Sequence, residues 1–260
     1  IETLREIGHE VRVRGVHDDL RGIRATVQSF TPHIVFNLLE AFAGITTFDQ
    51  NVVSYLELLR LPYTGCNPRG LILARDKALS KKLLAYHRVP VPDFTVVALG
   101  RRAKLPRKLQ FPLIVKSVFF ESSAGISQAS VVENEDQLAK RVTFIHESLG
   151  TAAIVEQFID GRELYVGVIG NDRLQTFTPW ELRAERLDPE EPFIATAKIK
   201  HDIDYQERLG VVQGEAEGLP SEVQATIGRT SKRIYRILGL RGYARIDYRL
   251  DATGRLYFLD

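Results

Sequence analysis

Hydrophobic residues in the first part of the chain follow two spacings, one typical of strands and one typical of helices. Alternating or short continuous apolar runs predict strands, whereas apolar residues three and four positions apart predict amphipathic helices. The expected strands are residues 10–16 and 33–38, and the expected helices are residues 18–30 and 50–59. This β-α-β-α order predicts that residues 1–72 form a domain with a small parallel sheet flanked by helices.

The remaining residues predict more strands and helices, and the strands become longer after residue 153. The expected helices are residues 76–86, 134–147 and 221–238. The expected strands are residues 94–98, 111–116, 128–132, 153–158, 163–169, 173–179, 243–250 and 255–260. We therefore expect an α/β protein whose second part, with its sequential strands and separate helices, has α+β character.

Three expected helices have recognisable starting signals. Asp76 and Asn134 stand where a side chain caps a helix N-terminus, and Ser221 with Gln224 has the spacing of a capping box. The helix after Asp76 is expected to bury one apolar face. That face consists of Leu79, Leu83 and Tyr86.

Composition excludes several classes of partner. The 35 basic residues nearly balance the 33 acidic ones, so the chain has no electrostatic footprint for nucleic acid or an anionic membrane. Apolar runs are too short to span a bilayer, so no membrane partner is expected. The single cysteine, Cys66, excludes an intramolecular disulfide and indicates a reducing compartment, the cytoplasm. The chain starts at Ile1 and contains no methionine, which indicates a segment of a longer protein or a sequence from which some residues are missing.

The last expected hairpin places two carboxylates close together. Asp247 lies on its first strand and Asp260 ends the second, and Mg²⁺ prefers a few carboxylates together with phosphate oxygens. Arg245 lies two residues before Asp247 and so shares its face of the strand. Solvated acids neutralised by Arg245 and Arg255 are the alternative. A cation beside a metal carboxylate suits a site that handles a phosphorylated intermediate.

Residues 154–163 run from a strand into a turn and out again, with acids on both sides. Backbone groups of Gln157 and Ile159 are candidates for contacts with an adenine edge. Glu156 and Glu163 are candidates for accepting hydrogen bonds from a nucleotide. A hairpin with solvated glutamates explains the same string equally well.

Two lysines and a short loop suggest phosphate binding. Lys116 ends an apolar strand, where a charge has no packing purpose, and Lys77 follows Asp76. The loop after Lys116 contains Ser122 and Ser123, and a Ser/Gly loop can fold over phosphates with its backbone N–H groups. The P-loop and the dinucleotide-binding glycine fingerprints are both absent, so neither of those nucleotide sites is expected.

The ordered set of these motifs resembles an ATP-grasp ligase, most closely the D-alanine–D-alanine ligase branch. The motifs are Arg75-Asp76-Lys77, residues 112–116, residues 121–126, residues 156–163, residues 244–247 and residues 258–260, with residues 36–40 and 55–65 resembling the N-terminal domain of that branch. The resemblance implies an ATP-grasp fold. Its parts would be an N-terminal domain at 1–72, a central subdomain at 73–153 and a C-terminal subdomain at 154–260.

The resemblance also implies a role for each candidate residue. Lys77, Lys116 and Lys200 match phosphate-binding lysines, with Lys198 as an alternative to Lys200, and Ser122 and Ser123 match the phosphate-covering loop. Glu156, Gln157, Ile159 and Glu163 match adenine and ribose contacts. Asp247 and Asp260 match magnesium ligands, and Arg245 matches the arginine that steadies the acyl-phosphate and tetrahedral species. The implied cofactors are ATP and Mg²⁺, or Mn²⁺ in its place.

Departures from the branch concern the substrate more than the nucleotide. Asp260 stands where a glutamate is usual, a metal-binding asparagine is expected two positions beyond it, and Glu121 replaces a usual glycine. Residues 40–47 replace a His-Gly-x-Gly-Glu-Asp-Gly stretch, so the glutamate expected to recognise the first amino acid is missing.

We therefore expect an ATP-dependent carboxylate–amine ligase of D-alanine–D-alanine ligase type that acts through an acyl phosphate. Its partners would be small amino acid or peptide substrates, and the resemblance suggests a homodimer. One alternative is a ligase on the same scaffold that acts on other amino acids or peptides. Another is an ATP-binding protein without ligase activity.

Overall fold

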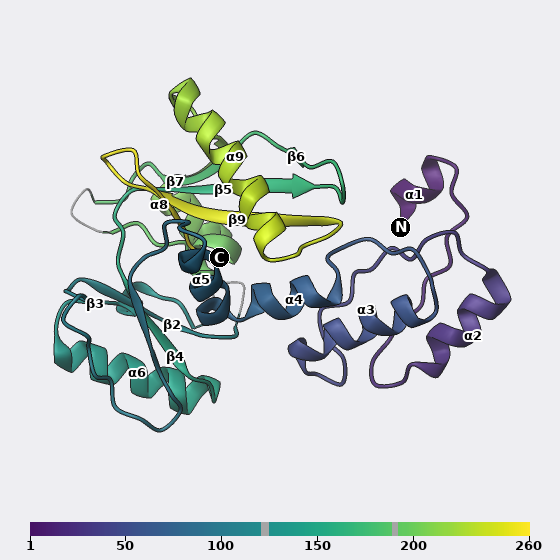
Figure 1. Ribbon diagram of the computed structural model, residues 1–260, viewed down its shortest axis with the longest axis horizontal. Coiled ribbons are helices and arrows are strands. Elements are labelled where there is room, and N and C mark those ends of the chain that lie inside the picture. The colour runs from purple at the N-terminus through teal and green to yellow at the C-terminus, as the bar shows by residue number, and fades with distance from the viewer. Residues whose placement is uncertain (121–124, 189–191) are drawn as a thin grey trace. The chain divides into compact units, whose positions relative to one another are not determined.

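The structure, a computed structural model, describes residues 1–120, 125–188 and 192–260 of a mixed α/β chain (Figure 1). The predicted α/β class is confirmed. The chain divides into two compact units, Ile1–Ile72 and Leu73–Asp260. Each unit has its own apolar core and is described by itself below.

The first unit consists mainly of short helices around a small core. They are α1 (Glu2–Glu6), α2 (Arg21–Phe30), the 3-10 turn η1 (Thr46–Phe48) and α3 (Asp49–Leu58), and α4 (Pro68–Arg75) crosses the boundary to the second unit. Ile23 of α2 packs with Val52 and Leu56 of α3 in that core. The predicted helices at 18–30 and 50–59 are thus confirmed, with slightly different starts.

The two predicted strands of this unit are wrong. Residues 10–16 form no strand, and residues 33–38 contribute one isolated parallel bridge, between Val35 and Tyr63. The expected buried run is largely exposed, with Ile34 54%, Phe36 53% and Leu38 74% exposed. An extended segment becomes a strand only when a neighbouring segment hydrogen-bonds its backbone groups along its length. Within the described part of this unit, residues 33–38 are paired in this way only at Val35, by Tyr63.

The second unit contains a four-stranded antiparallel sheet in the order β1-β4-β2-β3. Its strands are β1 (Phe94–Val97), β2 (Leu113–Ser117), β3 (Val131–Val132) and β4 (Ala153–Gln157). Helix α6 (Glu135–Leu149) packs on one face, where Leu113, Val115 and Val155 meet Ile145 in the core. On the opposite face Ile154 packs against Ala78 of helix α5 (Lys77–Tyr86). Because side chains alternate along a strand, Lys116 and Glu156 belong to this second face.

A six-stranded antiparallel sheet forms the other half of the second unit, in the order β10-β9-β5-β7-β8, with β6 paired to β5. Its strands are β5 (Arg162–Ile169), β6 (Gln175–Thr176), β7 (Trp180–Ala184), β8 (Val211–Glu215), β9 (Tyr243–Leu250) and β10 (Leu256–Phe258). Helix α9 (Ser221–Ile237) lies along this sheet (Figure 1). Ser231 of α9 hydrogen-bonds the hydroxyl of Tyr248 in β9 at 2.8 Å, so the even-numbered side chains of β9 face α9. The odd-numbered ones, among them Arg245 and Asp247, face away from it.

Several predicted elements of the second unit need correction. Helix α5 buries Lys77, Ala78, Ser80, Lys81 and Leu84, whereas the predicted face is exposed at Leu79 (37%) and Tyr86 (83%). Residues 128–132 begin as the 3-10 turn η2 (Gln128–Ser130), and only Gln175–Thr176 of residues 173–179 is a strand. Strands β7 and β8 and helices α7 (Ala197–His201) and α8 (Ile203–Leu209) were not predicted. Their short, polar-rich sequences carry little periodicity.

Helix caps give a mixed result. The side chains of Asp76 and Asn134 accept hydrogen bonds from the backbone N–H of Leu79 (2.8 Å) and Gln137 (3.0 Å), so both predicted N-caps are confirmed. The predicted capping box at Ser221 is wrong, because α9 starts at Ser221 with Pro220 as its N-cap and no side-chain cap bond. Gln224 instead donates to the carbonyl of Leu219.

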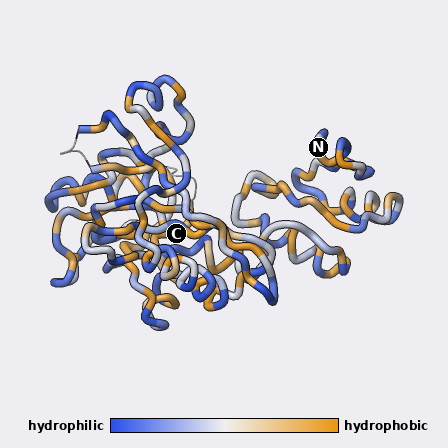
Figure 2. The backbone as a smooth tube through the Cα atoms, turned by 90° about the horizontal axis from the view of Figure 1, so that it is seen from above, coloured by the Kyte–Doolittle hydropathy of each residue, from blue (hydrophilic) through white to orange (hydrophobic). Residues whose placement is uncertain are grey.

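Hydrophobic residues are spread in short stretches along the chain, with orange and blue segments alternating in Figure 2. Among the described residues, no helix has both the length and the apolar character needed to cross a membrane.

The contrast between the two helix starts is testable. We expect Asn134→Ala to lower the free energy of unfolding by about 1 kcal/mol, because it removes an N-cap acceptor. Ser221→Ala should change it by less than about 0.5 kcal/mol, because that exposed hydroxyl caps nothing. Urea unfolding of both variants measures the difference. Equal losses for the two variants would contradict the assigned caps.

Candidate active site

A buried carboxylate between two lysines lies at the centre of the second unit. Glu156 of β4 is fully buried, and its Oε2 lies 3.2 Å from Nζ of Lys116 on neighbouring β2. Its Oε1 lies 3.4 Å from Nζ of Lys81 on α5, which is also fully buried. The side chain predicted to contact a nucleotide therefore holds two lysines in place, and Lys116 stands beside it as a buried cation.

The start of α5 brings a third lysine to the same place. Lys77 lies one helical turn before Lys81, and its ammonium donates to the carbonyl of Phe120 at 2.9 Å. It also lies 3.9 Å from Oδ1 of Asp260 at the end of the strand β10 segment. Two lysines on one face of a helix thus approach the same end of the large sheet.

Positive charge gathers around Asp260. Burial alone would raise the pKa of this carboxyl, but the nearby ammonium groups outweigh burial and hold the pKa below its ordinary value. The ammonium groups are those of Lys77, Lys116, Lys81 and Lys200. Among the described residues Asp260, Glu156 and Glu163 oppose these lysines, so four ammonium groups face three carboxylates and positive charge is in excess. Such an excess suits a polyphosphate.

Lys200, unlike Lys198, contributes to the positive charge around Asp260. Lys200 is half-buried on α7 and close enough to Asp260 to influence its pKa. Lys198 is exposed, and its ammonium lies 5.8 Å from the centre of the Tyr205 ring.

Arg245 and Asp247 form a bidentate pair on β9. Nε and Nη2 of Arg245 donate to Oδ1 and Oδ2 of Asp247 at 2.7 and 2.8 Å. The guanidinium also lies 4.8 Å from the centre of the Tyr165 ring on β5, where Tyr165 is the register partner of Asp247. Arg245 is thereby held flat against the sheet with its side chain still 60% exposed.

The two predicted metal carboxylates are neighbours in the sheet. The backbone N–H of Asp247 donates to the carbonyl of Asp260 at 2.9 Å, and Leu259 donates back to Asp247 at 2.8 Å. Burial raises the pKa of Asp247 to about 6 against the lowering effect of Arg245, and the charge of Asp260 adds to the rise. Two carboxylates that repel each other, that of Asp247 largely buried and that of Asp260 partly exposed, fit a divalent cation, which would relieve that repulsion.

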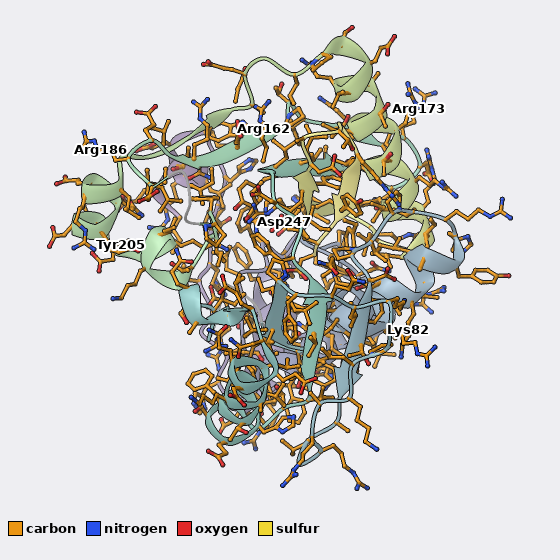
Figure 3. All side chains as sticks on the ribbon, turned by 90° about the vertical axis from the view of Figure 1, so that its left-hand side faces the viewer. Lys82, Arg162, Arg173, Arg186, Tyr205 and Asp247 are labelled. Carbon is orange, nitrogen blue, oxygen red and sulfur yellow. The ribbon has the colours of Figure 1, made fainter. Side chains whose placement is uncertain are left out.

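The described residues contain no group of three or more His, Cys, Asp or Glu side chains that could hold a metal by themselves. A pair of carboxylates remains consistent with Mg²⁺, which is usually bound by one or two carboxylates together with substrate phosphates. Figure 3 places Asp247 among the crowded side chains in the middle of the unit.

Glu163 begins a second buried network on β5. Its Oε1 accepts from the hydroxyl of Tyr165 at 2.6 Å, and its Oε2 accepts from Nη2 of Arg249 at 2.9 Å. Arg249 also donates to the carbonyls of Gly161 and Phe193, both at 2.7 Å. Glu163 is therefore fixed in position, and through Tyr165 it is linked to the Arg245–Asp247 pair.

The remaining predicted residues differ in what surrounds them. Gln157 ends β4, where its backbone N–H donates to Asp93 at 2.8 Å and its side chain donates to Pro112 at 3.2 Å. Ile159 is half-buried in the connection from β4 to β5. Ser122 and Ser123 lie outside the described residues.

Sequence reasoning missed Lys81, Tyr165 and Arg249. A signal existed for Lys81, because it follows Lys77 by four residues and so shares its helix face. A signal also existed for Arg249, because it lies two residues after Asp247 on the same strand. Its side chain therefore points to the same face of the strand as those of Asp247 and Arg245. Tyr165 carried no signal, because its role depends on the register between β5 and β9.

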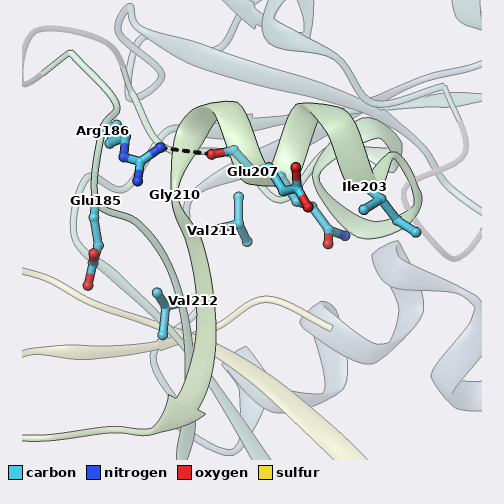
Figure 4. Close-up of a pocket in the computed structure, with 8 residues that line it drawn as sticks. Glu185, Arg186, Ile203, Glu207, Gly210, Val211 and Val212 are labelled. Atoms are coloured by element: carbon cyan, nitrogen blue, oxygen red, sulfur yellow. Dashed lines mark hydrogen bonds between the residues drawn. The ribbon is translucent and has the colours of Figure 1, made fainter.

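A shallow hollow of about 570 Å³ lies elsewhere, between the end of β7, helix α8 and β8 (Figure 4). Arg186 at its edge donates to the carbonyl of Glu207 at 3.1 Å. None of the predicted site residues lines this hollow, so it is separate from the lysine cluster.

Solved structures share this fold. A D-alanine–D-alanine ligase from Bacillus anthracis complexed with ATP has a TM-score of 0.68 and 21% identity, over 91% of this chain and 70% of that one. The VanG D-Ala:D-Ser ligase from Enterococcus faecalis has a TM-score of 0.63 and 22% identity, over 88% and 62% of the two chains. The predicted ATP-grasp fold is therefore confirmed.

Sequence comparisons give the family. Residues 83–260 match the family model described as "D-ala D-ala ligase C-terminus". The D-alanine–D-alanine ligase of Desulforudis audaxviator is 34% identical over 94% of this chain and 74% of its own length. An uncharacterized protein, y4sG, of Sinorhizobium fredii is 29% identical over 100% of this chain and 75% of its own length. The chain belongs to the D-alanine–D-alanine ligase family and is an ATP-dependent carboxylate–amine ligase that uses ATP and a divalent metal.

The Glu156 cluster predicts a large loss of stability from a small change. We expect Glu156→Gln to lower the free energy of unfolding by about 3–5 kcal/mol, because Lys81 and Lys116 would stay buried without a counter-charge. Urea unfolding at neutral pH measures the loss. Glu147→Gln, on the exposed part of α6, is the control and should cost less than about 0.5 kcal/mol. A loss below about 1 kcal/mol for Glu156→Gln would contradict a charged cluster.

Proposed function

We propose that this ligase joins the carboxylate of one amino acid to the amine of a second amino acid or peptide, with Mg²⁺ as its metal. The observation that carries the proposal is the meeting of four lysines and the Arg245–Asp247 pair around Asp260. The relatives named D-alanine–D-alanine ligase support an amino acid as the carboxylate substrate and make D-alanine the first candidate. A homodimer, a cytoplasmic location and the division of residues 73–260 at residue 153 stay predictions.

The lysines would hold the nucleotide phosphates. In this proposal Lys77, Lys116 and Lys200 neutralise the triphosphate, and Ser122 and Ser123 cover it. Glu163, Ile159 and Gln157 would contact the adenosine. Glu156 would act through the lysines, because its own oxygens face Lys81 and Lys116. A fixed cluster suits this purpose, since charges that are already in position need no rearrangement when the reaction begins.

Asp247 and Asp260 would hold the divalent cation, which supplies charge neutralisation for phosphoryl transfer when it is bound. A carboxylate oxygen of the first substrate attacks the γ-phosphorus, and the bond to ADP breaks. The amine nitrogen of the second substrate then attacks the acyl carbon. Inorganic phosphate leaves with the C–O bonding pair, and it can accept the proton that the nitrogen gives up. Negative charge develops on the leaving oxygen of ADP in the first step and on the carbonyl oxygen of the acyl phosphate in the second, and Arg245 would be an exposed cation beside these oxygens.

Arg245 is the residue for which we expect a kinetic rather than a binding effect. Arg245→Ala should lower kcat by about 10²–10³-fold, because it removes a fixed donor for developing charge. The KM for ATP should change little. Phosphate release measured at saturating ATP and metal checks this expectation. Arg173→Ala, an exposed arginine at the periphery of the unit in Figure 3, is the control and should keep the wild-type kcat.

Residues 40–47 favour a second candidate for the carboxylate substrate. The branch's glutamate for the first amino acid is absent there, and Phe42 and Ile45 close a tight turn through two backbone hydrogen bonds of 3.2 and 2.9 Å. Ala43 and Gly44 both adopt positive φ, 53° and 74°, in that turn. A hydrophobic turn in place of an acidic stretch favours an amino acid or peptide other than D-alanine.

A panel of D- and L-amino acids and dipeptides, assayed for ATP-dependent phosphate release, distinguishes the two candidates. Efficient synthesis of D-alanyl-D-alanine from D-alanine alone would establish the first candidate and exclude the second. Turnover with other pairs, with D-alanine used poorly, would establish the second. Chelation of the metal should stop turnover and added Mg²⁺ should restore it. Tight ATP binding without turnover on any pair would contradict both.

A further inference from the structure

Lys81 is a buried cation to which none of the roles above is given. Its side chain is fully buried on α5, and a lysine is rarely placed so deep unless it is paired. Burial lowers its pKa, and the charge of Glu156 opposes that effect. A hydrophobic residue would fill the same space without this desolvation cost, so the contacts that the ammonium makes call for an explanation.

Those contacts join the two sheets of the second unit. On one side the ammonium lies 3.4 Å from Oε1 of Glu156, on β4 of the four-stranded sheet. On the other side it donates a hydrogen bond to the carbonyl of Leu259, directly after β10 of the six-stranded sheet. It also lies 5.4 Å from the centre of the Phe258 ring, in cation–π range. One ammonium therefore connects the phosphate-side cluster with the end of the metal-carboxylate hairpin.

The carbonyl that Lys81 holds belongs to the peptide bond that leads into Asp260. Leu259 is further fixed by its N–H, which donates to Asp247 at 2.8 Å. Lys77, one turn earlier on α5, lies 3.9 Å from the Asp260 carboxylate itself. Helix α5 thus contacts the same strand end twice, once at the side chain of Asp260 and once at the backbone just before it.

We propose that Lys81 is a positioning residue that sets the place of the Asp260 carboxylate relative to Lys116 and so tunes metal binding in the ligation reaction. The proposal rests on the metal role proposed for Asp247 and Asp260. Lys81 does not touch substrate in this proposal. It acts on Asp260 by holding the carbonyl of Leu259, the residue before it. It acts on Lys116 through Glu156, which contacts both lysines.

Removing the ammonium should weaken metal activation more than nucleotide binding. Partners that orient metal ligands typically change metal affinity by about 10–100-fold when they are removed. In Lys81→Met we therefore expect the Mg²⁺ concentration for half-maximal activity to rise about 10–100-fold, with kcat partly restored at high Mg²⁺. The KM for ATP at saturating metal should change much less.

The experiment is a Mg²⁺ titration of the initial rate at saturating ATP, repeated with Mn²⁺. Lys82→Met is the matched control, because Lys82 is the adjacent residue of the same helix but is exposed and lies at the edge of the unit in Figure 3. Lys81→Gln keeps an N–H donor on a shorter side chain, so its half-activation should lie between those of wild type and Lys81→Met. Thermal unfolding of each variant accompanies the titrations.

The outcomes separate positioning from mere structural support. A lower melting temperature with wild-type Mg²⁺ and Mn²⁺ half-activation in Lys81→Met would overturn the proposal. If Lys81→Met does not fold, wild-type metal activation in Lys81→Gln overturns it instead. A rise in the metal requirement for Lys81 variants but not for Lys82→Met supports it. Failure of the proposed function would look different, because the wild-type enzyme itself would then show no metal-dependent turnover with any substrate pair.

Discussion

The buried carboxylate of Glu156 is the interaction on which the site depends. It lies within 3.4 Å of two ammonium groups that come from different elements, Lys81 of α5 and Lys116 of β2. Without that counter-charge, two cations would be stranded in an interior where isolated charges are costly. With it, α5 can lie against the four-stranded sheet and present Lys77 and Lys81 to the end of the other sheet. The positive cluster around Asp260 follows from this one arrangement.

Alternation along the strands then decides which side chains meet. In β2 and β4 the side chains on one face form a core with α6, and those on the other face include Lys116 and Glu156. In the large sheet the even-numbered side chains of β9 pack under α9. The odd-numbered ones include Arg245, Asp247 and Arg249. A one-residue shift in the pairing of any of these strands would turn its charged side chains toward the helix and its packed side chains toward the site. The stability of the two cores and the geometry of the site are therefore fixed by the same register.

Sequence reasoning was reliable where local signals decide the structure. The N-caps at Asp76 and Asn134 and the hairpin that carries Asp247 rest on residues close in sequence, and the family resemblance rests on short motifs in a fixed order along the chain. It failed for residues 10–16 and 33–38, because strand formation depends on a partner that local pattern does not specify. Lys81 was missed because a lysine is normally expected to face solvent. Its spacing from Lys77 indicated a shared helix face, and its distance from Glu156 shows that this face is buried. The network from Arg249 through Glu163 to Tyr165 likewise depends on cross-strand register. The loop with Ser122 and Ser123 lies outside the described residues.

The sharing of one carboxylate by two lysines constrains how this sequence can evolve. Loss of Glu156 leaves two ammonium groups without their shared counter-charge, and loss of Lys81 or Lys116 removes one of the two partners of a buried carboxylate, so each change alone passes through a weakened intermediate. Replacement of the cluster by an apolar one would require coordinated changes on α5, β2 and β4. These three positions should therefore vary together among descendants of this sequence, whereas an exposed neighbour such as Lys82 is free to drift.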